Sequence, residues 1–435
     1  MAYYFEKIIS WLFYALVFLL PLQTRLFIVK GQLNDGWWEY GTISIYLTDL
    51  LLLILLLLAG VYFWQTRLKP ADKEFRLKFI WFLIAGFDLA LFLSIFLAFD
   101  KILALFHYFW FLLAIGFFWL ITNFKYNQLV FIYSFLAGVF CQAVLAIIQF
   151  LTQTSFANSW LGLAGHQAGA LGVSVVETYA GRWLRAYGGL DHPNILGGLL
   201  VVAIILTLSL LARDKLKYQR LAILNYFFLL IFSAALFFSF SRSAWLGLAV
   251  GLAAMFVLNL KNQALANKKR VIAGILAVSG LFLVLGIVYK NIVFVRFNSS
   301  ARLEIKSQTQ RAQLLEQSFS LLKKHFLFGA GIGNYTLAVF KQINSQAPSW
   351  WYQPVHNTFL LVWAETGLFG FLFFISLLFY LGFRKYKNKS RFNYSFAFWP
   401  LLIALIIMLN FDHWWWSLHF GVLFFWFCLG VLAKD

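Results

Sequence analysis

The chain is dominated by long apolar runs that are separated by shorter polar segments. Twelve runs approach the ~20 residues that a membrane-spanning helix needs. None shows the alternation with a period of two that marks the strands of a membrane barrel. The runs are 8–28, 42–64, 79–98, 102–121, 128–151, 194–212, 222–240, 243–260, 271–289, 356–383, 396–411 and 417–433. The pattern predicts an all-α polytopic membrane protein with about twelve transmembrane helices.

Composition agrees with this class and excludes a soluble globule. The 435 residues are 62% hydrophobic and only 12% charged, with a mean hydropathy of +0.80. Cys141 and Cys428 both lie inside apolar runs, so neither a disulfide nor a metal site is expected. The first run follows Glu6 and Lys7, contains Pro21 and has no small-residue cleavage site, so we expect it to be retained as a span.

The net charge of +19 comes from basic residues that favour one side of the membrane. If the N-terminus is inside, the inner segments hold 21 of the 35 Lys and Arg residues and the short outer loops hold six. Both termini are therefore predicted to be cytoplasmic. This divides the chain into nine spans over 1–289 with an outer loop at about 152–191, a large outer loop over 290–355, and three spans over 356–435.

The large outer loop is expected to contain one amphipathic helix, from about Ser307 to Lys324. Leu315, Phe319, Leu322 and Phe326 form its apolar stripe, and Arg311 lies within about 40° of that stripe. The glycine-rich segment 329–334 follows this helix rather than a strand, so it is interpreted as a turn and not as a phosphate-binding loop.

A second helix is expected to open at His356, where the outer loop ends. On an ideal helix, Gly367 and Gly370 lie within about 20° and 40° of His356, so they would let a neighbouring helix approach beneath the histidine. Glu365 would lie about 180° away and is not expected to be its partner. The alternative is an interfacial histidine with only a structural role.

Two further outer segments concentrate unusual polar residues. The loop before the sixth run ends with Arg182, Arg185 and Asp191-His192-Pro193-Asn194, and Pro193 is expected to begin the next helix. Arg242 lies in a tight hairpin between the seventh and eighth runs. A charged residue at this depth is costly unless it is paired or used. The alternative is an arginine that only anchors the helix at the membrane surface.

Arginines together with one histidine suggest phosphate chemistry at the outer surface. The arginine fork binds phosphate oxygens in a bidentate manner, so several converging arginines can neutralise a diphosphate leaving group without a metal. A neutral imidazole can accept a proton from an incoming hydroxyl. Asp72 and Glu74 are a close carboxylate pair on the inner side, but they lie among lysines and arginines and are interpreted as a solvated loop.

These motifs resemble the O-antigen ligase and polymerase superfamily. His356-Asn357, nine residues, Gly367, two residues and Gly370 follow the pattern of the ligases and the related O-oligosaccharyltransferases. The segments around Arg185, Arg242, Arg311 and Glu365 support the match over about 182–370. The resemblance implies a GT-C-like fold and transfer of a glycan from undecaprenyl diphosphate at the outer face of the bacterial cytoplasmic membrane. It further implies that His356 is the base and that Arg185, Arg242 and Arg311 bind the diphosphate.

Supporting roles are expected for a second group of residues: Arg182, His192, Asn194, Asn357, Glu365 and Asp412. Asp412 lies in the last outer turn, from which it could orient His356. No metal or cofactor is expected, and the partners are the lipid-linked donor, a lipid, glycan or protein acceptor, and the bilayer.

Several alternatives remain open at this stage. The chain does not distinguish a ligase from a polymerase or a protein O-oligosaccharyltransferase of the same superfamily. A polysaccharide flippase or transporter has a similar number of spans, but it would be expected to show internal repeats and polar residues near the midplane. A metal-dependent sugar transferase would use Asp35 or Glu39 in the first outer loop.

Overall fold

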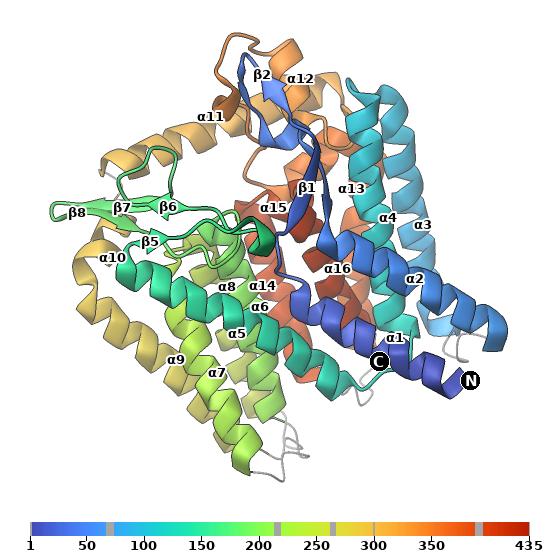
Figure 1. Ribbon diagram of the computed structural model, residues 1–435, viewed down its shortest axis with the longest axis vertical. Coiled ribbons are helices and arrows are strands. Elements are labelled where there is room, and N and C mark those ends of the chain that lie inside the picture. The colour runs from blue at the N-terminus through green and yellow to red at the C-terminus, as the bar shows by residue number, and fades with distance from the viewer. Residues whose placement is uncertain are drawn as a thin grey trace.

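The computed structural model describes residues 2–66, 74–212, 219–261, 267–298, 301–387 and 395–434. It is a bundle of long helices, one end of which is covered by short strands and helices (Figure 1). The long helices are α1 (Ala2–Leu19), α2 (Leu47–Thr66), α3 (Glu74–Leu97), α4 (Lys101–Asn123), α5 (Gln128–Thr152), α6 (Pro193–Leu211), α7 (Gln219–Phe238), α8 (Arg242–Lys261), α9 (Lys268–Val288), α11 (Arg302–Lys324), α13 (Thr358–Lys387), α14 (Ser395–Phe411) and α16 (His419–Ala433). The short ones are α10 (Lys290–Phe297), α12 (Tyr335–Gln342) and α15 (Trp414–Ser417).

Each of the twelve apolar runs coincides with a helix, which confirms the all-α membrane class. Within the described residues, nine helices are long and apolar enough to cross a membrane, and 396–411 and 419–433 form shorter apolar helices. The count of twelve spans stays a prediction. The first run was predicted to extend to residue 28, but α1 ends at Leu19 and Arg25–Val29 is a strand. Most of the basic inner loops lie outside the described residues.

Helix α6 occupies the centre of the bundle. All 19 of its residues are buried, and it packs against α5, α7, α8, α9 and α14. The sequence explains this position, because the helix has an apolar residue on every face and therefore no side that prefers water. Pro193 is its first residue, as the sequence predicted, and the ring of His192 caps it. The residues that precede α6 are thereby held at the end of the bundle where this helix begins.

Small hairpins that the apolar pattern did not predict fold the outer loops. Strand β1 (Arg25–Val29) pairs with β4 (Ile43–Tyr46), and β7 (Val175–Thr178) pairs with β8 (Gly181–Leu184). Two-residue pairs are formed by β2 (Gln32–Leu33) with β3 (Gly36–Trp37) and by β5 (Thr154–Ser155) with β6 (His166–Gln167). Together with α11 and α12 they cover the same end of the bundle (Figure 1).

Helix α11 begins five residues earlier than predicted and buries a different face. Of the predicted stripe only Leu322 is buried, whereas Leu315, Phe319 and Phe326 are exposed. The buried positions are Glu304, Leu314, Gln317, Ser318, Leu321 and Leu322. The predicted face was wrong because Glu304, a buried glutamate in the first turn, determines which side of the helix packs against the protein. A search for apolar residues does not consider a glutamate.

The helix predicted to open at His356 instead begins at Thr358 and is broken at Gly367. Gly367 has φ 71° and ψ −174°, which a residue with a side chain rarely adopts. The backbone groups freed by this break are bound by the preceding loop: Ala330 N–H donates to Ala364 O (2.8 Å), Gly331 N–H to Glu365 O (3.0 Å) and Leu368 N–H to Phe326 O (2.9 Å). The prediction that Gly367 shares a helical face with His356 is therefore wrong. Gly370 does lie against a neighbour, Ala90 of α3.

Candidate functional site

Asp412 is the buried centre of a polar cluster at one end of the bundle, where α6, α8 and α13 begin and α14 ends. It follows directly after α14 and is only 3% exposed. Asn194 donates a hydrogen bond to Oδ1 (2.8 Å) and the Ser243 hydroxyl donates one to Oδ2 (2.6 Å). The hydroxyl of Thr358 donates to the backbone oxygen of Asp412 (2.7 Å), which fixes the start of α13 beside it.

His356 lies next to this carboxylate, two residues before α13. Its Nδ1 is 3.9 Å from Oδ1 of Asp412, and its side chain is 24% exposed. This distance suits attraction to a protonated imidazole but is too long for a hydrogen bond. The ring of His413 packs against it, with 4.9 Å between ring centroids. The histidine is thus open to a substrate on one side and next to a carboxylate on the other.

The environment of Asp412 keeps it ionised. Burial acts to raise its pKa, but the neighbouring His356, the hydrogen bond from Ser243 and the charge of Arg311 outweigh burial and lower the pKa to about 2. A negative charge at this position would stabilise a protonated imidazole on His356.

Arg185 is the innermost arginine of the cluster and is 5% exposed. Its Nε donates to Ser239 O (2.8 Å) and its Nη2 donates to Oδ1 of Asn194 (2.7 Å), so Asn194 links Arg185 to Asp412. Burial, followed by the charge of Arg296, lowers the pKa of Arg185. Arginine nevertheless stays charged at working pH. An anion entering the site would therefore relieve an unfavourable positive potential.

Arg242 lies in the hairpin between α7 and α8 and is held by the outer loop. Its Nη2 forms an ion pair with Oε2 of Glu304 (2.8 Å), and its Nη1 donates to Arg296 O (3.1 Å). Arg296 forms an ion pair with the other oxygen of the same carboxylate. Arg296 and Glu304 were not identified from the sequence. The sequence feature that could have identified Glu304 is its spacing of seven residues from Arg311, which places both on one face of a helix.

Arg311 extends the positive charge of the cluster from α11. It is partly buried, and no hydrogen bond or ion pair joins it to any residue that the structure describes. Its charge lowers the pKa of Asp412 and of His413. Arg185 and Arg311 thus interact electrostatically with Asp412, and Arg242 is connected to them through Arg296, which interacts with all three arginines.

Arg182 and Asn357, two of the residues with expected supporting roles, bind backbone groups. The guanidinium of Arg182 donates to the loop carbonyls of Gly169 (2.9 Å) and Ala170 (3.4 Å), so it stabilises that loop. Asn357 caps α13 through Leu360 N–H (3.0 Å) and donates to Asn410 O (3.2 Å).

His192 is held at the start of α6. Its Nδ1 accepts from Asn194 N–H (3.1 Å), and its Nε2 lies 3.0 Å from the Ser174 hydroxyl. Burial, then the charge of Arg185, lowers its pKa to about 3. The ring is therefore neutral at neutral pH.

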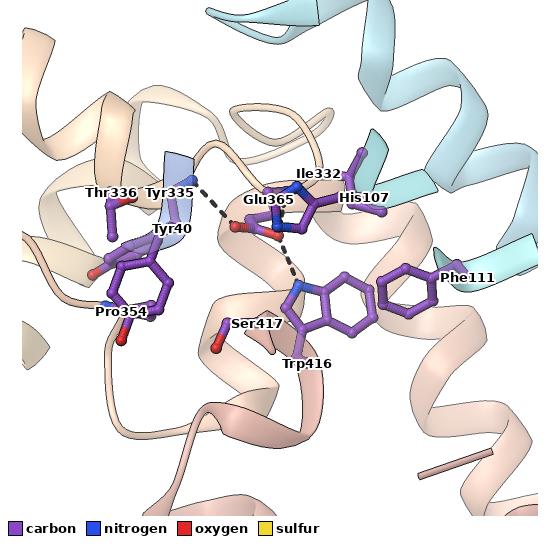
Figure 2. A pocket seen from close by; sticks show the side chains of 11 residues that line it. Tyr40, His107, Phe111, Ile332, Tyr335, Thr336, Pro354, Glu365, Trp416 and Ser417 are labelled. Carbon is purple, nitrogen blue, oxygen red and sulfur yellow. Dashed lines mark hydrogen bonds between the residues drawn. The ribbon is translucent and has the colours of Figure 1, made fainter. Parts of the chain in front are cut away.

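Glu365 binds the backbone of the glycine-rich turn rather than the histidine. Its two oxygens accept from Gly333 N–H (2.9 Å), Tyr335 N–H (3.1 Å) and Trp416 Nε1 (2.7 Å). Figure 2 shows the carboxylate at a small cavity, with His107 and Trp416 beside it. The cavity is lined by Tyr40, His107, Phe111, Ile332, Gly333, Tyr335, Thr336, Pro354, Glu365, Trp416 and Ser417. Glu365 thus has a structural place, and the turn at 329–334 is packed on α13.

The carboxylates considered for a metal-dependent reaction are placed elsewhere. Glu39 forms an ion pair with Arg25 (2.5 Å), and Asp35 lies in the exposed turn between β2 and β3. Among the residues that the structure describes, no group of three or more His, Cys, Asp and Glu side chains is arranged to hold a metal ion.

Comparison with known proteins relates part of the chain to a protein family. Residues 227–375 match the family model described as O-antigen ligase. The matched segment runs from α7 into α13, so it contains Arg242, Arg296, Glu304, Arg311 and His356. No curated protein matches the chain.

Proposed function

We propose that this chain, a multi-pass membrane protein of the O-antigen ligase superfamily, transfers a glycan from an undecaprenyl-diphosphate-linked donor to an acceptor hydroxyl. The reaction takes place at the outer face of the bacterial cytoplasmic membrane, on a GT-C-like helical framework with both termini in the cytoplasm. The observation that carries the proposal is the cluster of four arginines, one of them buried, beside the carboxylate that adjoins His356.

The charges of the cluster suit a diphosphate. Four arginines, Arg185, Arg242, Arg296 and Arg311, face two carboxylates, Glu304 and Asp412. The surplus of two positive charges equals the charge of a diphosphate esterified at both ends. The site also lies where the outer loops meet the helix ends, so the polyprenyl chain of the donor can remain in the bilayer.

In the proposed reaction, His356 accepts the proton of the acceptor hydroxyl as its oxygen attacks the anomeric carbon of the donor sugar. The bond between that carbon and the phosphate oxygen breaks, and its electron pair leaves with undecaprenyl diphosphate. Asp412 stabilises the imidazolium, and the arginines stabilise the negative charge that develops on the leaving group. The charges for this step come from side chains, so the proposed reaction needs no divalent metal.

A ligase, a polysaccharide polymerase and a protein O-oligosaccharyltransferase would all use this arrangement, and the ligase reaction is our first choice. A flippase is the candidate from another class. It would also need a diphosphate site but would not need a base beside it, so the position of His356 next to Asp412 favours transfer.

The test measures the rate at which the protein transfers glycan from purified lipid-linked donor to the acceptor in membranes. The donor and the membranes both come from a deletion strain, and a chelator is present. His356→Ala should lower turnover by roughly 10²–10⁴ and leave donor binding largely intact. The matched control is His325→Ala, because His325 is a partly buried histidine of the same outer loop that contacts Gln342. Activity abolished by chelator and restored by magnesium or manganese, with His356→Ala nearly as fast as wild type, would contradict the mechanism.

A further inference from the structure

Arg242, Glu304 and Arg296 form a compact ionic triad that the proposed mechanism does not fully use. The two oxygens of Glu304 each pair with a different guanidinium, and the carboxylate is only 6% exposed. Two guanidiniums this close repel each other, so the shared carboxylate is what allows them to lie side by side. Both arginines remain partly accessible, with side-chain exposures of 31% for Arg242 and 13% for Arg296.

The triad leaves many donors unused. A guanidinium has five N–H groups. Arg242 donates one hydrogen bond, from Nη1 to Arg296 O, whereas its Nη2 lies in an ion pair with Glu304 that is not a hydrogen bond. Arg296 uses one N–H on Nη1 for Glu304 and one on Nε for Phe240 O (3.1 Å). Within the described residues, at least three N–H groups therefore remain on each arginine, and phosphate oxygens are acceptors that fit such forks.

From this geometry we propose that Arg296 is a fourth arginine that binds the diphosphate of the donor, and that Glu304 is the positioning residue that aligns Arg296 with Arg242. The proposal rests on the proposed function and assigns the second phosphate of the donor. Arg242 and Arg296 bind one phosphate through their unused N–H groups, while Arg185 and Arg311 serve the other. Each phosphate thus meets two guanidiniums.

Glu304 also determines where Arg311 points. The two residues are seven positions apart on α11, which is two turns with an offset of only about 20°. Because Glu304 is anchored in the triad, the same face of α11 carries Arg311 toward Asp412. The neighbouring Arg302 faces elsewhere: it is 73% exposed and pairs with Glu177 (2.9 Å). Arg302 is therefore a natural control, since it is an arginine of the same helical turn, also paired with a glutamate, but outside the triad.

The first experiment measures binding of inorganic pyrophosphate to the purified full-length protein by calorimetry at fixed salt. Arg296→Lys keeps the charge but loses the fork, so it should weaken binding about tenfold or more, as Arg242→Lys should. Arg302→Lys should bind like wild type. If Arg185→Lys and Arg242→Lys weaken binding and Arg296→Lys does not, this inference is wrong while the proposed function stands. If the wild type does not bind pyrophosphate, both are wrong.

The role of Glu304 is tested by the sign of its effect. Glu304→Gln adds one net positive charge, so electrostatics alone would tighten pyrophosphate binding. A positioning role predicts the opposite, about tenfold weaker binding, because the two guanidiniums separate. Tighter binding would overturn that role. Glu177→Gln, which removes a carboxylate paired with an arginine outside the triad, is the control and should leave binding unchanged.

A measurement on the unaltered protein covers the case in which a variant fails to fold. Phenylglyoxal modifies accessible arginines, and mass spectrometry identifies the modified positions. Pyrophosphate should slow the modification of Arg242 and Arg296 and leave that of Arg302 unchanged. Protection of Arg242 without protection of Arg296 would also contradict the inference.

Discussion

The side-chain amide of Asn194 donates a hydrogen bond of 2.8 Å to Asp412, which follows it by 218 positions in the chain. The carbonyl of the same amide accepts a hydrogen bond from Arg185. One asparagine therefore connects the innermost arginine to the carboxylate beside His356, and the phosphate-binding and proton-accepting parts of the proposed site are mechanically joined.

Asp412→Asn should slow transfer by about a hundredfold, because the imidazolium of His356 loses the charge that stabilises it. Turnover is measured for the transfer reaction with saturating donor. Asp35→Asn, at an exposed turn, is the control, and a slower Asp35→Asn with a normal Asp412→Asn would instead favour the alternative carboxylates.

Lysine cannot replace the arginines that bind phosphate through a fork. Arg185→Lys, Arg242→Lys and Arg311→Lys should each lose nearly as much turnover as the alanine variants, on the order of 3 kcal/mol or roughly a hundredfold. Arg182→Lys should keep near-normal activity, because Arg182 binds loop carbonyls. Lysine variants with normal turnover at the three positions would show them to be membrane anchors.

The neutral state of His192 makes stability depend on pH. Its pKa is lowered to about 3 in the folded protein, whereas an unfolded histidine titrates near 6.5. The unfolded chain therefore binds one more proton in this window, and stability falls by up to about 1.4 kcal/mol per pH unit as the pH drops from about 6.5 to about 3.

His192→Asn tests this assignment, because asparagine retains a side-chain oxygen to cap α6 but does not titrate. Thermal unfolding measured from pH 7 to pH 4 should show a weaker pH dependence in the variant than in the wild type. Some dependence should remain, since burial also lowers the pKa of His413. Equal slopes in the two proteins would refute the assignment.

Gly367→Ala should destabilise the protein strongly. A Cβ there would lie 2.2 Å from Leu327 O and 2.5 Å from the Cα of Phe328. These are backbone atoms that cannot rotate away, and the positive φ adds strain. Gly280→Ala in α9 is the matched control, because no atom lies within 4 Å of its Cβ position. Thermal unfolding should show a clear loss for Gly367→Ala alone, and similar melting temperatures would mean that the loop adjusts.

The orientation can be tested with single cysteines in a protein that lacks Cys141 and Cys428. A cysteine at Asn344 should react with an impermeant reagent in intact spheroplasts, and one at Lys387 should react only after the membrane is opened. Labelling of Lys387 in sealed spheroplasts would reverse the predicted topology and, with it, the outer location of the site.

The sequence predicted the parts of the fold that depend on local chemistry. Apolar runs located the helices because a span must be apolar throughout its length. Pro193 indicated the start of α6 because proline favours a first helical turn. Arg242 was identified as a candidate site residue because the tight hairpin around it provides few polar neighbours. Each of these signals is contained within a few neighbouring residues.

The parts that were missed depend on contacts between distant segments. The break at Gly367 is stabilised by loop residues 326–331, which supply partners for the freed backbone groups. A helical wheel describes the residues of one helix only and therefore does not include this loop. Glu304 and Arg296 were missed because their partners lie in the distant hairpin between α7 and α8, where Glu304 pairs with Arg242 and Arg296 binds Phe240 O. The pairing of β1 with β4 spans a loop whose residues show no clear alternation, so it was not predicted.

The central position of α6 also has a consequence for biosynthesis. The helix is buried on all sides, yet one of its permanent neighbours, α14, is made about 200 residues later. During synthesis α6 must therefore meet lipid or temporary partners before α14 arrives. Asn194 and Ser243 gain their shared carboxylate only once Asp412 has been inserted. A nascent chain that ended before α14 would thus lack Asp412 and the polar cluster that is built around it.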